Sequence, residues 1–524
     1  MTPSSARSVP EEQYINVAAS IIADISSGIY RTPANALKEL ISNAFDADAT
    51  EVAISTDYPR FDVMTCTDNG NGMSRKEFVT TMGRIGGSEK RADGDRTGLG
   101  RRIIGKIGIG ILAVAQIANS FSVISSKKGD STKFEARIDL LPFQDQDAYR
   151  YALADQKVKI GRYVIYRDLP EESARHYTTI VLKDVKDGFK RSLMDSESPD
   201  TRVSGFRIRP GDPKNILEFV QWLQGRRVRD ISEYNRLLWE LAVMAPVPYL
   251  GDGPVKGARP IPEIRRRLLA NKFRVRVDGL ELRKPLLFPT DPEITKPRHD
   301  FQVYDDIEFE GQVDEAPLRF SGYIYHQRKR IYPPELGGIL VRIRDVAIDS
   351  YDRSLLNYPK SEGPMASGIS GEIYVEEGLE GALNIDRNSF RESDPHYLKL
   401  QEVLFDRLGA PHGITMDVRR RSQARSDEVW QAKVEDQHSR IARVIKRVTG
   451  EEYQIVRLEE AGDTPIRIAK DAGRIYIYEN PIFPRRKAER LAMERMLILF
   501  EMANQQAASK QEARDQFYRL IRGR

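Results

Sequence analysis

The sequence is poor in cysteine, tryptophan and histidine, and it has no long apolar run. Its 524 residues include one cysteine, three tryptophans and six histidines. A single thiol, Cys66, excludes a disulfide framework and a cysteine-rich zinc site, and no two histidines are spaced as zinc ligands are. The most apolar stretch, residues 103–124, is interrupted by Lys106, Gln116 and Asn119, so it cannot span a membrane. We therefore expect a cytoplasmic protein without zinc or membrane contact.

The charge of the chain is nearly balanced. There are 82 lysines and arginines against 77 acidic residues, a net charge of +5, and 40% of the residues are hydrophobic, which suits a folded globular protein. This charge permits contact with nucleic acid without requiring it. Breaks rich in turn-forming residues at 185–215, 251–262 and 411–413 indicate three domains, residues 1–200, 201–412 and 413–524.

Apolar spacing predicts the main elements at the two ends of the chain. Residues 14–26 and 33–47 repeat apolar side chains at helical spacing, and two strands are expected over 51–56 and 62–68. The last hundred or so residues predict a basic helix over about 416–447, and a single long helix from Pro484 to about Arg522.

The stretch ALKELISNAFDADAT, residues 36–50, places polar side chains on one face of the second predicted helix. Glu39 and Asn43 are four residues apart and Asp46 is three further on, so all three share that face. A carboxylate and a carboxamide placed in this way can orient a water molecule and hold a divalent ion. Taken alone, the pattern is equally typical of a solvated helix face.

Two glycine-rich motifs follow. Asp68-Asn-Gly-Asn-Gly-Met73 comes directly after a predicted strand, where an acidic side chain can accept a hydrogen bond from the amino group of a base, although Asn-Gly also favours a simple tight turn. Gly105-Lys-Ile-Gly-Ile-Gly110 precedes a predicted helix, and exposed N–H groups at such a helix start bind phosphate. It is not a Walker A loop, because no Gly-Lys-Ser/Thr is present there.

The order and spacing of these three motifs resemble the GHKL ATPase superfamily of DNA gyrase, 90-kDa heat-shock chaperones, histidine kinases and MutL. A fourth element, Thr178 and Thr179 at the head of the strand TTIVL, is similar to the family's Gly-Thr strand, with Tyr177 in place of the glycine. The resemblance implies an α+β protein. Its N-terminal domain would be a Bergerat-type sandwich of a mixed sheet covered by helices, followed by a transducer-like middle domain and a helix-rich C-terminal region.

The resemblance also assigns roles to the matching residues, with ATP and Mg²⁺ as cofactors. Glu39 would be the general base, Asn43 the Mg²⁺ ligand, Asp46 a support of the site and Asp68 the acceptor of the adenine amino group. The remaining nucleotide contacts would come from Gly70, Gly72 and Met73 near the base, Gly105, Lys106, Gly108 and Gly110 at the phosphates, and Thr178 at the adenine edge. Residues 83–105 would form the lid over ATP.

A basic residue of the middle domain would complete the site. The segment GALNIDRNSFRE, residues 381–392, resembles the chaperones' middle-domain segment, which makes Arg387 the candidate catalytic arginine. A planar cation there would stabilise charge on the transferred phosphate. Lys360 is the alternative basic residue, because MutL-like transducers use a lysine on a loop. Arg387 could also be a surface arginine near a helix cap, with no catalytic role.

The branch of the superfamily is left open between two hypotheses. The initial helix and the strand after the third motif resemble the heat-shock chaperones, so a homodimeric, ATP-gated clamp that remodels protein clients is the first hypothesis. A DNA-associated clamp resembling MutL or the microrchidia (MORC) ATPases is the second, supported by the basic C-terminal helix, although such arginine runs are more often solvated faces. A degenerate, non-hydrolysing binding module is disfavoured because Glu39 and Asn43 are both present.

Overall fold

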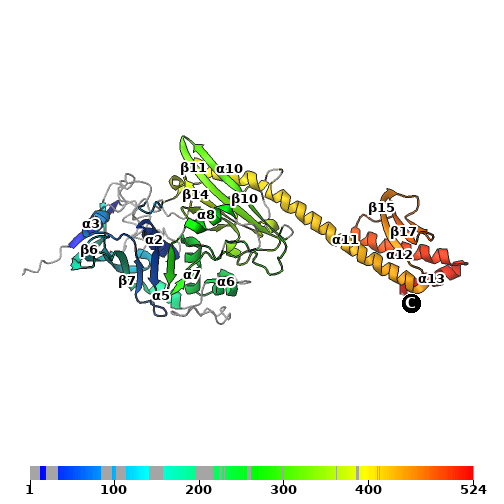
Figure 1. Cartoon of the computed structure of the whole chain (residues 1–524), viewed down its shortest axis with the longest axis horizontal. Helices are drawn as coiled ribbons and strands as arrows, with labels where there is room; N and C mark the ends of the chain where they lie inside the picture. Colours follow the sequence, from blue (N-terminus) through cyan, green and yellow to red (C-terminus); the bar gives the residue numbers. More distant parts are fainter. Residues whose placement is uncertain are drawn as a thin grey trace, which may run out of the picture. The chain divides into compact units, whose positions relative to one another are not determined.

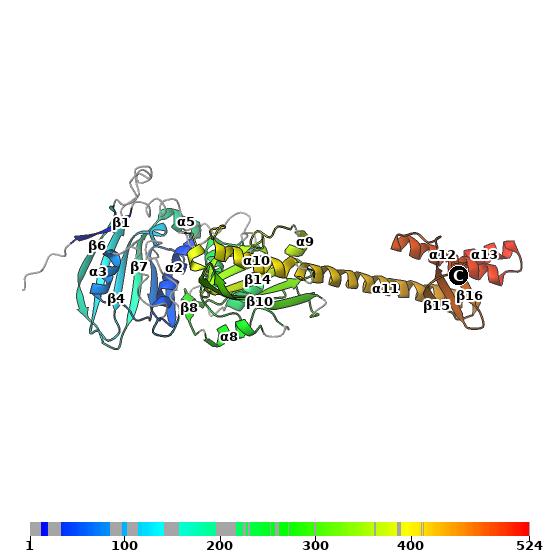
Figure 2. The same ribbon diagram turned by 90° about the horizontal axis from the view of Figure 1, so that it is seen from above.

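The chain divides into two compact units, residues 1–416 and 417–524. The structure is a computed structural model (Figures 1 and 2). It describes residues 12–18, 33–83, 97–101, 114–140, 157–194, 216–223, 227–228, 231–251, 253–256, 261–270, 272–297, 300–360, 363–384, 389–409, 411 and 413–522. Among the described helices, none combines the length and the apolar composition needed to cross a bilayer.

A nine-stranded mixed sheet forms the first half of the larger unit. The strand order is β1-β6-β5-β4-β7-β3-β2-β8-β9, and all neighbours are antiparallel except the parallel pair β2 and β8. The strands are β1 (Glu12–Ala18), β2 (Glu51–Ser55), β3 (Met64–Asp68), β4 (Ala118–Ser126), β5 (Thr132–Leu140), β6 (Lys157–Pro170), β7 (Tyr177–Val185), β8 (Arg274–Val277) and β9 (Leu280–Glu281). The sheet therefore draws on residues on both sides of the domain boundary expected at residue 200, and that boundary stays a prediction.

The helix predicted over residues 14–26 is wrong where the structure describes it. Residues 12–18 form β1, which pairs with β6 through partners such as Tyr14 and Arg162, and residues 19–26 lie outside the described residues. The segment EQYINVA holds Tyr, Ile and Val, which favour strands, and the available edge of β6 satisfies its backbone. The helix predicted over 33–47 is confirmed as α2 (Pro33–Asp46), and the two strands after it are β2 and β3.

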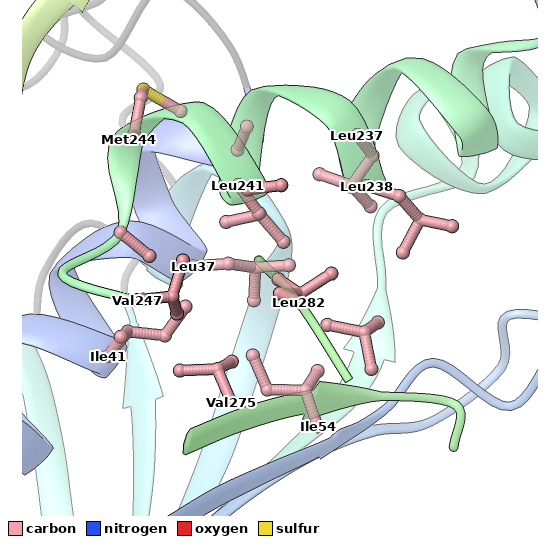
Figure 3. Packing of buried hydrophobic residues seen from close by; sticks show 14 of the residues in the cluster. Leu37, Ile41, Ile54, Leu237, Leu238, Leu241, Met244, Val247, Val275 and Leu282 are labelled. Carbon is pink, nitrogen blue, oxygen red and sulfur yellow. The ribbon is translucent and has the colours of Figure 1, made fainter. Parts of the chain in front are cut away.

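Two helices pack together over β2 and β8. Side chains of α2 and of α7 (Glu233–Met244) converge with those of the two strands in one buried cluster (Figure 3). Leu37 and Ile41 of α2 and Leu241 of α7 are no more than 1% exposed. The other helices of this part are α3 (Arg75–Gly83), α5 (Asp187–Met194), α6 (Ile216–Leu223) and α8 (Pro262–Ala270). This packing fixes the orientation of α2, the helix that carries Glu39 and Asn43.

A second, five-stranded sheet follows in the same unit, with the order β10-β11-β14-β12-β13. Its strands are β10 (Phe301–Val313), β11 (Ala316–Gln327), β12 (Gly338–Ile343), β13 (Val346–Asp352) and β14 (Ile369–Glu377), and the helices beside it are α9 (Gly363–Ala366) and α10 (Pro395–Gly409). The helix α10 lies across one face of this sheet (Figure 2).

A fully buried ion pair joins the second sheet to α7. The Arg342 guanidinium contacts the Glu372 carboxylate at 2.6 Å and donates to the carbonyl oxygen of Val243, in the last turn of α7, at 2.8 Å. The Tyr249 and Tyr323 hydroxyls donate to the same carboxylate at 2.6 and 2.8 Å. A buried charge pair is tolerated when further hydrogen bonds satisfy it, and these bonds meet that condition.

The C-terminal unit is built from helices and a small sheet. The basic helix predicted there is confirmed as α11 (Ile414–Thr449), which begins in the larger unit. The sheet order is β15-β17-β16, with β15 (Gln454–Ala461), β16 (Ile466–Ala469) and β17 (Arg474–Glu479). The single long helix predicted from Pro484 is wrong: there are two helices, α12 (Lys487–Gln506) and α13 (Lys510–Arg522). Ser509 accepts a hydrogen bond from the N–H of Glu512 and so starts the second helix.

Candidate active site

The helix α2 buries part of its polar face. Leu37, Leu40 and Ile41 form an apolar stripe that holds α2 in the core. Glu39 is only 4% exposed, whereas Asn43, one turn further on, is exposed and Asp46 is half-buried. A carboxylate removed from water in this way does not belong to an ordinary solvated helix face. The solvated interpretation therefore does not hold for Glu39, and its role as general base stays a prediction.

Asp68 ends β3 in a half-buried position. Its carboxylate accepts a hydrogen bond from the N–H of Gly70 at 2.8 Å and another from the N–H of Thr178. Burial raises the pKa of Asp68 to about 6, although these two bonds and the nearby His176 oppose the rise. Asp68 therefore offers a half-buried acceptor at a strand end, and its role at the adenine amino group stays a prediction.

The turn after Asp68 is held against the end of α2. The N–H of Asn71 donates to the carbonyl oxygen of Ala47 at 2.7 Å, and the Asn69 side chain accepts from the N–H groups of Thr50 and Glu51 at 2.8 and 2.9 Å. These bonds bring the first and second motifs together, as the sequence predicts. The His176 ring donates to the carbonyl oxygen of Gly70 at 2.6 Å and closes the turn from the other side.

The fold itself requires glycine at two positions of this turn. Gly72 has φ +62°, and a Cβ there would lie 1.9 Å from the carbonyl oxygen of Ser126. A Cβ on Gly70 would lie 2.7 Å from the carbonyl oxygen of Ala47. Both contacts are impossibly short, so these glycines let strands and helix approach each other. Their predicted role beside the adenine stays a prediction.

Ser125 joins Met73 and Thr178, two residues predicted to lie beside the adenine, and the sequence motifs do not reveal it. This buried hydroxyl accepts from the N–H of Met73 at 2.9 Å and donates to the carbonyl oxygen of Tyr177 at 2.9 Å. It also lies 3.0 Å from the Thr178 hydroxyl, which is itself buried. One side chain of β4 therefore positions both Met73 and Thr178. The strand holds four serines, Ser120, Ser122, Ser125 and Ser126, so nothing in the sequence singles out Ser125.

A second group missed by sequence reasoning anchors residues 97–101, part of the predicted lid. Although burial alone would raise the pKa of Asp48, hydrogen bonds from Thr97, Leu99, Asn71 and Gly98 lower it. The N–H of Leu99 donates to this carboxylate at 3.2 Å and the Asn71 amide at 3.1 Å. The carboxylate therefore joins residues 97–101 to the turn of the second motif.

Arg101 fixes the same segment to the end of α2. Its guanidinium donates to the carbonyl oxygen of Ala49 at 2.6 Å and lies 4.4 Å from the centre of the Phe45 ring. The carbonyl oxygens after a helix end are unsatisfied unless a donor reaches them, and a guanidinium can serve them while stacking on an aromatic face. Residues 97–101 are thus tied down at the base of the site.

Several predicted residues lie outside the described part of the chain. These are Gly105, Lys106, Gly108 and Gly110 of the third motif and Arg387 of the middle domain. Lys360 is described: it is exposed and borders a pocket of about 400 Å³ together with Arg330 and Arg353. The structure therefore shows a basic pocket at the alternative transducer lysine.

The described residues fit an adenine nucleotide better than a protein-held metal. Asp68, Thr178 and the turn 70–73 supply an acceptor, a hydroxyl and close backbone for a base. Among the described residues, no three His, Cys, Asp or Glu side chains gather as metal ligands. Mg²⁺ at nucleotide sites is commonly held by one or two protein oxygens and the substrate phosphates, so Asn43 alone is compatible with it.

Comparisons with known proteins agree with this geometry. Residues 30–160 match the sequence profile of the histidine kinase-, DNA gyrase B- and HSP90-like ATPases. A putative type II restriction enzyme, HgiDII of Herpetosiphon aurantiacus, is 40% identical over 246 residues, which is 44% of this chain and 37% of that protein. The DNA mismatch repair protein MutL of Pelobacter propionicus is 32% identical over 121 residues, 23% of this chain and 19% of MutL.

A chaperone is also similar. The chaperone protein HtpG of Anaplasma marginale is 28% identical over 144 residues, 23% of this chain and 22% of HtpG. The matched regions span well under half the length of each of these relatives. Residues 30–160 therefore match the ATPase domain of the GHKL superfamily, and MutL and HtpG are among the proteins to which the chain is similar.

Proposed function

We propose that the chain is a Mg²⁺-dependent enzyme that hydrolyses ATP to ADP and phosphate and works as an ATP-gated dimeric clamp. The observation that carries the proposal is the buried carboxylate of Glu39 on α2, one turn before the exposed amide of Asn43, on a helix locked to the Asp68 turn. A carboxylate shielded from water in this way can take a proton from an attacking water molecule.

Each residue has a distinct part in this proposal. Asp68 binds the adenine amino group, with Thr178 and Met73 beside it in positions set by Ser125. Asn43 holds Mg²⁺, which supplies charge neutralisation at the phosphates when bound. Glu39 orients the water and accepts its proton. Asp46 supports the site from the last turn of α2.

The remaining motifs would act on the phosphates. Gly105, Lys106, Gly108 and Gly110 donate to them, and either Arg387 or Lys360 completes the site from the middle region. The clamp would act either on protein clients, as a chaperone-like clamp does, or on DNA, as a MutL-like clamp does. Relatives of both kinds match the chain, so an experiment has to choose between them.

Steady-state ATP hydrolysis tests the proposal. Glu39→Ala should lower kcat by about a hundredfold while ATP still binds, because only the proton acceptor is lost. Glu172→Ala, which removes an exposed carboxylate of the same unit, is the matched control and should keep full activity. Retained turnover in the Glu39 variant would contradict the general-base role, and turnover in excess EDTA would contradict the Mg²⁺ role.

Three further experiments test the transducer cation, dimerisation and the choice between DNA and protein clients. Arg387→Ala and Lys360→Ala are compared, and the one that lowers kcat with little change in ATP affinity identifies the transducer cation. The mass in solution with and without a non-hydrolysable ATP analogue tests ATP-gated dimerisation, which a constant monomer mass would contradict. Stimulation of turnover by duplex DNA, lost at high salt, would select the DNA-associated clamp over the chaperone-like one.

A further inference from the structure

The C-terminal unit contains an open groove between two helices. It has a volume of about 790 Å³ and is bordered by the second half of α11, by α12 and by the end of α13. The charged side chains on its border are Lys433, Asp436, Arg440, Arg443, Arg447 and Arg495. We call this the α11–α12 groove. It lies within one compact unit, so its shape does not depend on the placement of the two units.

The groove is strongly basic. Its five cations are exposed, and the one acid among the described residues on its border, Asp436, pairs with Arg440 at 2.9 Å. Within the part of the chain that the structure describes, no acidic side chain pairs with Lys433, Arg443 or Arg495. Residues 417–524 hold 23 lysines and arginines against 17 acidic residues, a net charge of +6 compared with +5 for the whole chain. The net positive charge of the protein therefore resides in this unit.

The cations are spaced for a long, repetitive anion. Lys433, Arg440, Arg443 and Arg447 follow one another along α11 over 14 residues, or about 21 Å at 1.5 Å per residue. Arg495 faces them from α12. Four of the five are arginines, whose planar fork of donors matches phosphate oxygens. A nucleic-acid backbone presents such phosphates at regular intervals over this length.

The rest of the lining argues against other polyanions. Ile441, Leu491, Leu499 and Leu520 border the groove but are each 8% exposed or less, so they offer little surface to an amphipathic acidic peptide. Among the described residues that line the groove there is no aromatic side chain, whereas single-stranded nucleic acids are held by stacking of bases on aromatic rings. We propose that the α11–α12 groove binds the phosphate backbone of duplex DNA, without reading its sequence.

This inference does not depend on ATP hydrolysis, so it can fail or succeed separately from the proposed function. Binding of the full-length chain to a fluorescein-labelled 25-base-pair duplex is measured by anisotropy, without nucleotide, between 50 and 200 mM NaCl. The test variant is Lys433→Gln/Arg443→Gln/Arg495→Gln. It should bind at least about tenfold more weakly at low salt, and the slope of log K against log [salt] should fall by about 2 to 3, since each lost phosphate contact removes about 0.9.

The matched control removes the same charges elsewhere in the unit. Arg467→Gln/Lys470→Gln/Arg474→Gln changes two arginines and one lysine that are exposed on and beside β16 and β17, and it should bind within about twofold of the unchanged protein. Unchanged ATP hydrolysis in both variants would show that the larger unit is intact. If the triple variant does not fold, Arg495→Glu alone replaces it as the test, and it should weaken DNA binding several-fold.

Four outcomes would overturn the inference. They are no binding of duplex DNA at 50 mM NaCl, equal losses in the test and control variants, tighter binding of a single-stranded oligonucleotide than of the duplex, and displacement of the duplex by polyglutamate at equal charge concentration. The third outcome would indicate a single-strand site and the fourth an acidic protein partner.

Discussion

Replacing Asp68 by asparagine should stabilise the nucleotide-free protein above pH 6 while removing ATP binding. Burial raises the pKa of Asp68 to about 6, from 3.8 for the unperturbed group. The ionised form is therefore disfavoured in the folded state. The associated stability is fully present below the unfolded pKa and is lost as the pH rises through about 6.

The size of this effect follows from the shift. A difference of roughly two pKa units corresponds to about 3 kcal/mol at most. Because the carboxylate is half-buried rather than enclosed, and asparagine keeps one oxygen for the Gly70 N–H, we expect a gain of about 1 to 2 kcal/mol at pH 8. The gain should fall to roughly half at pH 5, where the Asp68 carboxyl is protonated in the folded protein but ionised in the unfolded one.

Cys66 provides the assay, because the chain's one thiol lies on β3 two residues before Asp68 and is buried. Burial also raises the pKa of this thiol, so labelling by 4,4′-dithiodipyridine requires β3 to open. At pH 8 the Asp68→Asn protein should be labelled roughly tenfold more slowly than the unchanged protein, and at pH 5 the ratio should be smaller. ATP should slow labelling of the unchanged protein only.

The control is Asp62→Asn, which removes an exposed carboxylate shortly before β3. Hydrogen bonding to Lys190 lowers the pKa of Asp62, the opposite of Asp68, so this variant should not slow labelling. Faster labelling of the Asp68 variant at pH 8, or a ratio that does not change with pH, would refute the reasoning. Normal ATP protection in that variant would refute the adenine role.

Three other substitutions test the supports of the site. Ser125→Ala leaves the Met73 N–H without its acceptor, so KM for ATP should rise several-fold with a smaller change in kcat, and an unchanged KM would contradict the positioning role of Ser125. Arg101→Lys cannot both stack on Phe45 and donate to Ala49, so hydrogen exchange at residues 97–101 should accelerate by about tenfold, and exchange at the original rate would count against the anchor. Gly72→Ala places a Cβ 1.9 Å from the Ser126 carbonyl oxygen and should lower the melting temperature by several degrees and weaken ATP binding, whereas a protein of normal stability would show that the turn can rearrange.

The sequence predicts those parts of the site that are formed by short, continuous segments of the chain. The helix α2, the turn from Asp68 to Met73 and the strand at Thr178 each carry their own local pattern, and their order places them in one domain type. Ser125 and Arg101 carry no such pattern, because their roles depend on partners more than 50 residues away.

The secondary-structure predictions that were wrong also depend on contacts that a local sequence pattern does not show. Tyr14 to Ala18 lie in a strand because the edge of β6 pairs with them, which outweighs the helical spacing of their apolar residues. The break between α12 and α13 depends on the Ser509 cap, a single hydroxyl within a helix-compatible stretch. The parallel pairing of β2 with β8 joins segments more than 200 residues apart and could not be read from either segment alone.

That parallel pairing limits how the nucleotide-binding region can be transferred between proteins. A fragment that ends before β8 would leave β2 with a free row of backbone donors and acceptors, and Val52 and Ile54 would lose part of their cover. Such a fragment is expected to associate through this edge rather than remain monomeric. The nucleotide-binding region therefore cannot be cut soon after its last sequence motif without exposing β2. A gene fusion or chimaera that preserved it would have to carry the chain at least as far as Glu281.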